Sequence, residues 1–138
     1  MAVLKLEVVT AEHLAYSDEV SIVIAPGVMG QLGILPDHAA LMTMLALGEL
    51  IVRKGDGEVS MAVTGGFLEV LDNKVTVLAD AAERADEIDI ARAEDAKRRA
   101  EEMLKAKPAG ADLAVAEGAL RRSLGRLKVA ERRRRKNV

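Results

Sequence analysis

The sequence contains no cysteine and no tryptophan, and Tyr16 and Phe67 are its only aromatic residues. Without cysteine the chain has neither a disulfide framework nor a zinc–thiolate site. With so few rings, a hydrophobic core must be built from Val, Leu, Ile, Met and Ala, within the 50% of residues that are apolar. The length of 138 residues suits one ordinary domain or two small ones.

Long apolar runs are also missing. No stretch reaches the roughly 18–20 residues that a membrane-spanning helix needs. The first residues, MAVLKLEVV, have neither a basic leading segment nor a small-residue cleavage site, so we expect no signal peptide. The sequence therefore predicts a soluble, cytoplasmic protein without direct membrane insertion, which meets a membrane only through a partner.

Patterns that carry chemistry are scarce. His13 and His38 are 25 residues apart without a nearby acidic cluster, which predicts hydrogen-bonded loop histidines and no metal site. No serine lies in a G-x-S-x-G elbow, so we predict no catalytic residues. The net charge of −2 and the lack of an aromatic stacking platform argue against nucleic acid. An enzyme with a β-sandwich active site is thus the least supported interpretation.

What the sequence does have is a change of character near residue 86. Residues 1–86 hold 5 Lys+Arg against 13 Asp+Glu, a net charge of −8. Residues 87–138 hold 15 against 9, a net charge of +6, so the two parts give the overall −2. This asymmetry predicts two modules with different partners, residues 1–86 and 87–138.

The first module reads as short strands. Residues 3–10, 19–25, 49–54, 58–64, 67–71 and 74–78 carry strand patterns. Gly55-Asp56-Gly57 and Asp72-Asn73 are hairpin turns, and Gly65-Gly66 is expected to turn the chain. Many short strands with little helix between them predict an antiparallel β-sandwich or flattened barrel.

The segment 26–38 is rich in glycine, but its spacing matches no phosphate-binding loop, so turns and a bulge are expected. Its apolar residues Val28, Met29 and Leu32 leave two interpretations open. They are isolated exposed residues of a loop, or they form a docking patch.

The second module reads as two helices. Residues 87–105 contain no glycine or proline, and Asp86 and Glu87 suit the helix start. Pro108-Ala-Gly110 breaks the helix, and Asp112 is a candidate cap for a second one that runs to about Arg133. The short connection predicts an antiparallel hairpin, and hence an α+β fold. Its apolar seam is expected from Ile88, Ala93, Ala96, Ala100, Met103 and Leu104 on the first helix and Leu113, Ala116, Leu120, Leu124 and Leu127 on the second.

Arginines are placed at helical spacing in this module. Arg92 and Arg99 share a face of the first helix, and Arg122 and Arg126 form a ridge on the second. In a folded hairpin they are able to converge on one polyanion, and guanidinium groups favour bidentate phosphate contacts. The alternative is a solvated surface with ordinary pairs to Asp95 and Glu102. The final run, residues 132–136, reads as a frayed basic tail or a contact for an acidic surface.

The chain resembles the epsilon subunit of bacterial F-type ATP synthases over essentially its full length. The resemblance is carried by Gly27-x-x-Gly30-x-Leu32-Gly33-Ile34-Leu35-Pro36-x-His38-Ala39-x-Leu41-x-Thr43, by Gly48-Glu49-Leu50 and by Gly65-Gly66-Phe67. It implies a β-sandwich that holds the gamma subunit and rests on the c-ring of a proton-translocating enzyme, at the cytoplasmic face of the cell membrane. A ring-facing loop with Val28, Met29, Leu32 and His38 is implied as well.

The hexapeptide Ile88–Ala93 is similar to the I/L-D-x-x-R-A motif of epsilon subunits that bind ATP. The resemblance implies that ATP, as a regulatory ligand and not a required cofactor, holds the hairpin folded against the sandwich. It also implies a second state, in which the extended hairpin reaches the beta and alpha subunits and inhibits hydrolysis. The alternatives are a free-standing ATP sensor and an epsilon subunit that does not bind ATP. The implied ATP-binding residues are Glu83, Ile88, Asp89, Arg92, Ala93, Arg99, Arg122 and Arg126.

Overall fold

The computed structural model describes residues 2–136, and the side chains of residues 2–132. The chain divides into two compact units, Met1–Arg84 and Ala85–Val138, so the division lies two residues before the predicted one. The first unit contains β1 (Leu4–Val9), β2 (Leu14–Val20), β3 (Ile22–Gly27), β4 (Gly30–Ile34), β5 (Leu41–Lys54), β6 (Gly57–Leu71), β7 (Lys74–Ala79) and β8 (Ala82–Arg84). The second contains η1 (Ala85–Glu87), α1 (Ile90–Lys105) and α2 (Ala111–Lys136).

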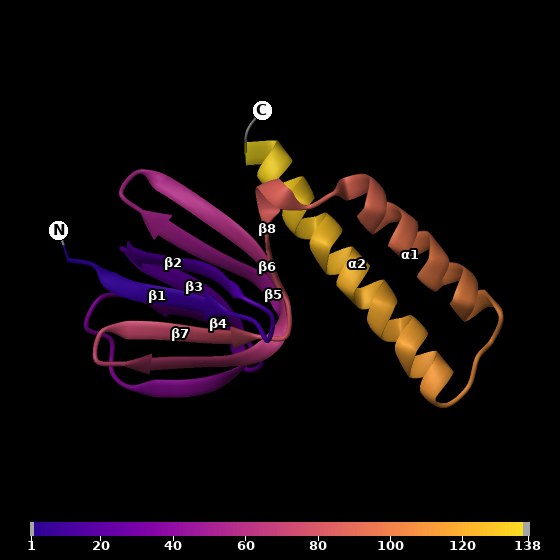
Figure 1. Cartoon of the computed structure of the whole chain (residues 1–138), viewed down its shortest axis with the longest axis horizontal. Helices are drawn as coiled ribbons and strands as arrows, with labels where there is room; N and C mark the ends of the chain where they lie inside the picture. Colours follow the sequence, from indigo (N-terminus) through magenta and orange to yellow (C-terminus); the bar gives the residue numbers. More distant parts are fainter. Residues whose placement is uncertain (1, 137–138) are drawn as a thin grey trace. The chain divides into compact units, whose positions relative to one another are not determined.

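The eight strands form one curled sheet. Their order is β2-β1-β7-β6-β5-β3-β4, with β8 paired to β6. The sheet curls so that its strands form two facing layers. Buried residues of β1 to β7 meet in a single cluster between these layers, and Leu6, Leu50 and Leu68 are fully enclosed. The long strands β5 and β6 pair along almost their whole length and extend through the bend of the sheet (Figure 1). This confirms the predicted β-sandwich, in which β1–β7 is a parallel pair and the other pairs are antiparallel.

The two predicted hairpin turns are present. Gly55 has a φ of 57° in the turn between β5 and β6. Asp72 and Asn73 have φ values of 49° and 61°, which fits a two-residue turn between β6 and β7. Asn73 also joins three segments: its Oδ1 accepts from the Asp37 N–H at 2.8 Å, and its Nδ2 donates to the Val3 carbonyl at 2.9 Å.

Gly65-Gly66 does not turn the chain, contrary to the prediction. Both glycines have positive φ, 93° and 115°, yet β6 continues through them to Leu71. Gly66 lies opposite Leu45 on one side and Ala79 on the other. The pair therefore bends a long strand where two neighbouring strands approach closely, a role that glycine serves as readily as a turn.

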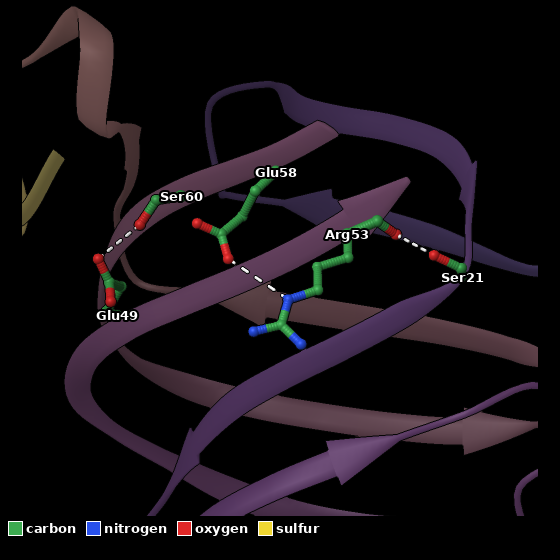
Figure 2. A network of polar contacts seen from close by, with 5 residues as sticks. All are labelled: Ser21, Glu49, Arg53, Glu58 and Ser60. Atoms are coloured by element: carbon green, nitrogen blue, oxygen red, sulfur yellow. Dashed lines mark hydrogen bonds and ion pairs between the residues drawn. The ribbon is translucent and has the colours of Figure 1, made fainter. Parts of the chain in front are cut away.

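Two further strand predictions need correction. The stretch 19–25 is not one strand, because the chain bends at Ser21, whose N–H and hydroxyl both donate to the Arg53 carbonyl at 2.8 Å. The segment 26–38 is not all turns, because it contains β4. Figure 2 shows the Ser21–Arg53 contact beside two side-chain pairs of β5 and β6, Arg53–Glu58 and Glu49–Ser60, the latter a 2.6 Å hydrogen bond.

The second unit is the predicted helical hairpin. Helices α1 and α2 pack against each other, and the loop between them includes Lys107 in a left-handed conformation and Pro108. Helix α1 begins after Asp89 and not at Asp86, which with Glu87 forms the short η1. Helix α2 begins at Ala111, so Asp112 lies in its first turn and is not its cap. It ends at Lys136, so the backbone of the basic run is helical; the side chains of residues 133–136 lie outside the described residues.

Candidate functional site

The hexapeptide Ile88–Ala93 forms the beginning of α1. Asp89 is the N-cap: its carboxylate accepts a hydrogen bond from the Arg92 N–H at 3.1 Å, and its carbonyl accepts from the Ala93 N–H at 3.0 Å. Ile88 and Ala93 are buried, whereas the Arg92 side chain is exposed. The motif thus combines a cap that fixes the helix start with an arginine presented to solvent.

The seam between the helices is built from small side chains. Ala93, Ala100, Ala116 and Ser123 are buried, and the Ser123 hydroxyl donates to the Ala119 carbonyl at 2.9 Å. Burying an alanine methyl gains about 0.8 kcal/mol, against roughly 1.5–3 kcal/mol for a larger apolar side chain. Two large members of the predicted seam, Met103 and Leu124, are instead 45% exposed. Among the described residues of this unit, Ile88 and Val129 are the large buried side chains, and Leu104, Leu113, Leu120 and Leu127 are half-buried, so the larger residues contribute only part of their burial energy.

The four arginines lie on one face of the hairpin. The opposite face has a groove of about 630 Å³ that both helices line, with Glu94, Lys97 and Glu101 on α1. An α-helix turns by about 100° per residue. Around α1, Arg92 and Arg99 therefore lie on one side of the buried Ala93 and Ala100, and these groove residues lie on the other side. The full lining is Ile90, Glu94, Lys97, Arg98, Glu101, Leu124, Leu127, Lys128 and Glu131.

The same rotation per residue separates two sides of α2. Leu124 and Lys128 line the groove, whereas Arg122 and Arg126 lie on the other side of the buried Ala116 and Ser123. Arg122 is exposed and Arg126 is half-buried. The face that carries Arg92, Arg99, Arg122 and Arg126 is called the arginine face below.

The remaining predicted ligand, Glu83, belongs to the first unit. It lies on β8, opposite Ala62 of β6, and is half-buried. The eight predicted ATP-binding residues are thus divided between the two units, with seven of them on the hairpin and the segment that leads into it. Asp95, which the sequence offers as a partner for an arginine, forms an ion pair with Arg98.

The predicted ring-facing residues surround a tight turn. Val28 and Met29 form the turn between β3 and β4 and are 52% and 94% exposed. Leu32 lies on β4 and is half-buried, whereas His38 is exposed in the following loop, where its Nδ1 lies 2.8 Å from the Ala39 carbonyl oxygen. The Val28 N–H donates to the Met44 carbonyl at 3.0 Å, which joins this turn to β5.

An exposed apolar row on the sandwich was not predicted from the sequence. Met44, Phe67 and Leu78 pair across β5, β6 and β7, and the pairing continues to Val9 and Leu14 on β1 and β2. Directly paired residues share a sheet face, and the neighbours of this row along the strands, such as Leu68 and Val77, face the core. These five residues are called the apolar band below. Met44, Phe67, Leu78 and Leu14 are each about half exposed, at 54%, 49%, 54% and 56%.

Titratable groups with shifted pKa values lie elsewhere on the sandwich. Asp18 of β2 and Lys54 of β5 form an ion pair of 2.7 Å. The hydrogen bond between them lowers the pKa of the Asp18 carboxyl and raises the pKa of the Lys54 amine. Burial, followed by the charge of Asp18, raises the pKa of Tyr16. Within residues 2–136 we find no cluster of three metal-ligating side chains and no helix long and apolar enough to cross a membrane.

Comparison with known proteins shows which family this chain matches. Residues 3–85 match the family model of the ATP synthase delta/epsilon chain β-sandwich domain, and residues 86–131 match that of its long α-helix domain. An ATP synthase epsilon chain of Dehalococcoides mccartyi is 56% identical over 135 residues, which is 97% of this chain and 96% of the relative. An ATP synthase epsilon chain of Herpetosiphon aurantiacus is 52% identical over 131 residues, 95% of this chain and 96% of the relative.

The fold also recurs in solved structures. A chain of the Euglena gracilis mitochondrial ATP synthase, from a structure of its OSCP, F1 and c-ring, superposes with a TM-score of 0.76 at 24% identity. The match covers 88% of this chain and 77% of the other. A β-sandwich followed by a helical hairpin is thus a fold that this chain shares with that chain of the ATP synthase structure. The chain belongs to the ATP synthase delta/epsilon family, and the relatives named above are epsilon chains.

Proposed function

We propose that this chain is a non-catalytic rotor subunit of a proton-translocating F-type ATP synthase. The observation that carries the proposal is the apolar band, because a monomeric soluble protein rarely leaves such a row of large side chains in water. The occupant of the band is the gamma subunit of the central stalk. The family match over both units supports this assignment, since the matched relatives are subunits of that complex.

The turn of Val28 and Met29 extends the docking surface toward the c-ring. It lies beside Met44 through the hydrogen bond of the Val28 N–H. Met29, at 94% exposure, has almost its whole side chain available for a partner. In this arrangement the sandwich holds gamma and the ring together, and the subunit is peripheral at the cytoplasmic face of the cell membrane.

The hairpin acts as a regulatory switch in this proposal. The arginine face binds the phosphates of ATP, because guanidinium groups form bidentate, charge-assisted hydrogen bonds with phosphate oxygens. The seam of Ala93, Ala100, Ala116 and Ser123 adds little burial energy, so ligand binding decides whether the helices stay together. At a hundredfold excess over Kd, a ligand that binds only the folded form stabilises it by about 2.7 kcal/mol.

The released hairpin is inhibitory. Residues 87–138 carry a net charge of +6, which suits contact with acidic segments of the beta and alpha subunits. Low ATP therefore frees the hairpin and prevents wasteful hydrolysis. No reaction is assigned to this chain itself, and ATP is a regulatory ligand.

Binding to purified gamma tests the rotor assignment. We expect a stable complex with the full chain, and strong loss of binding for Phe67→Asp, which puts a charge within the apolar band between Met44 and Leu78. Lys97→Asp, on the groove side of α1, is the matched control and should bind as the wild type does. A wild-type chain that fails to bind gamma but still binds ATP would instead support a free-standing ATP sensor.

A further inference from the structure

Three exposed thioether side chains lie on or beside the apolar band. Met44 belongs to the band, and Met42 precedes it by two residues on β5, so both side chains point to the same outer face. Met29 lies in the turn that the Val28 N–H joins to Met44 at 3.0 Å. Their exposed fractions are 94% for Met29, 67% for Met42 and 54% for Met44. These three residues are called the methionine cluster.

The other described methionines provide an internal contrast. Met61 is fully buried in the sandwich core, and Met103 is 45% exposed on α1, in the other unit. Thioether oxidation requires access of the oxidant to sulfur. The cluster thus combines high access with a position on the proposed docking surface, and neither Met61 nor Met103 has both.

We propose that the methionine cluster is a peroxide-sensitive modification site that controls docking of the gamma subunit. The inference rests on the proposed function. In each step a thioether sulfur attacks one oxygen of hydrogen peroxide and the O–O bond breaks. Sulfur keeps that oxygen and is oxidised to a sulfoxide, while the peroxide is reduced and its other oxygen leaves as water.

The sulfoxide changes the docking surface chemically. A flexible apolar side chain becomes a polar one, whose S=O oxygen must lose its water when a partner covers it. Because docked gamma shields the band, the modification acts on the unassembled chain and keeps the oxidised chain out of the complex. Methionine sulfoxide reductases restore the thioether and with it the ability to assemble.

The test uses the full chain, hydrogen peroxide and purified gamma subunit. Peptide mass spectrometry should show sulfoxide at Met29, Met42 and Met44 before any appears at Met61. Over the same period the affinity for gamma should fall by about tenfold or more, a loss of at least about 1.4 kcal/mol, and reductase treatment should restore it. Circular dichroism checks that the oxidised chain remains folded.

Leucine variants separate the cluster from other methionines. The triple variant Met29→Leu, Met42→Leu, Met44→Leu conserves volume and should bind gamma normally before and after peroxide. The matched variant Met103→Leu should lose affinity on oxidation as the wild type does. Unchanged affinity after the cluster is oxidised overturns the inference, and so does an equal loss in the triple variant. If the untreated chain does not bind gamma, the proposed function fails first, and this inference with it.

Discussion

Replacement of Gly66 by alanine should be among the most damaging single changes in the sandwich. The residue has a φ of 115°, and an added Cβ would lie 2.0 Å from the Leu78 carbonyl oxygen and 2.8 Å from the Ala79 Cα. Both obstacles are backbone atoms of the paired strand β7, so no change of rotamer relieves the overlap. Either β6 and β7 separate locally or the strand changes its conformation.

The cost has two parts. A non-glycine residue in such a backbone region costs of order 1–3 kcal/mol, and overpacking costs typically 1–3 kcal/mol more. The sum, about 2–6 kcal/mol, is a large part of the 5–15 kcal/mol that stabilises an ordinary domain. Urea unfolding followed by tyrosine fluorescence measures it, because the only tyrosine, Tyr16, lies on β2 and reports the sandwich alone.

Two glycines serve as matched controls. In Gly55→Ala the added Cβ meets no atom within 4 Å, but the residue keeps a φ of 57°. This substitution should therefore lower the free energy of unfolding by only about 1–2 kcal/mol. Gly33→Ala has open space and no positive φ, so its effect should stay within about 0.5 kcal/mol. If Gly66→Ala unfolds at the same urea concentration as Gly33→Ala, the close approach of β6 and β7 at this position is wrong.

Three further predictions concern named contacts. Asp89→Ala should destabilise the hairpin by about 1 kcal/mol, because the Arg92 N–H loses its cap, whereas Asp89→Asn should retain most of it; amide hydrogen exchange of α1 measures both. Asp18→Asn should remove the contribution of the Asp18–Lys54 ion pair to the free energy of unfolding. In the wild type this contribution is lost as the pH falls through the lowered pKa of Asp18, or as it rises through the raised pKa of Lys54. In urea unfolding the two proteins should therefore differ near neutral pH. They should converge only at a pH below the lowered pKa of Asp18, under its ordinary value of 3.8, or above the raised pKa of Lys54, over its ordinary value of 10.5. Asn73→Ala should cost about 1–3 kcal/mol in the same assay, because the Asp37 N–H and the Val3 carbonyl both lose their partner.

Local signals allowed most of the architecture to be predicted from the sequence. Asp72-Asn73 specifies a hairpin through residues that tolerate positive φ, and the glycine-free run before Lys105 specifies a helix. The prediction for Gly65-Gly66 was wrong, because a glycine pair fits both a turn and a close approach of two strands. Only the positions of β5 and β7 decide between them.

The helix start was misplaced for a similar reason. Asp86, Glu87 and Asp89 are all acceptable near a helix N-terminus, and the choice depends on which carboxylate reaches a free N–H. In the structure that carboxylate belongs to Asp89. The motif residue Asp89 thus has a structural role that the sequence motif alone did not reveal.

The apolar band could not be predicted from periodicity. Met44, Phe67 and Leu78 are separated by 23 and 11 positions and meet only through strand register. The one local signal was the nearly continuous apolar run from Leu41 to Leu47, where both faces of a strand carry apolar side chains. Such a run is also typical of a strand buried on both faces, so exposure had to come from the fold.

Titration of the full chain with ATP, followed by backbone amide NMR, tests the central claim that the arginine face is a regulatory ATP site. We expect saturable shifts at Ala93 and Arg126 at or below millimolar ATP. Arg92→Ala should weaken them at least about tenfold while the β-sandwich resonances stay in place. Arg98→Ala, on the groove side of α1, should bind ATP as the wild type does. No shift at either residue at millimolar ATP, or equal shifts in Arg92→Ala, would contradict the account.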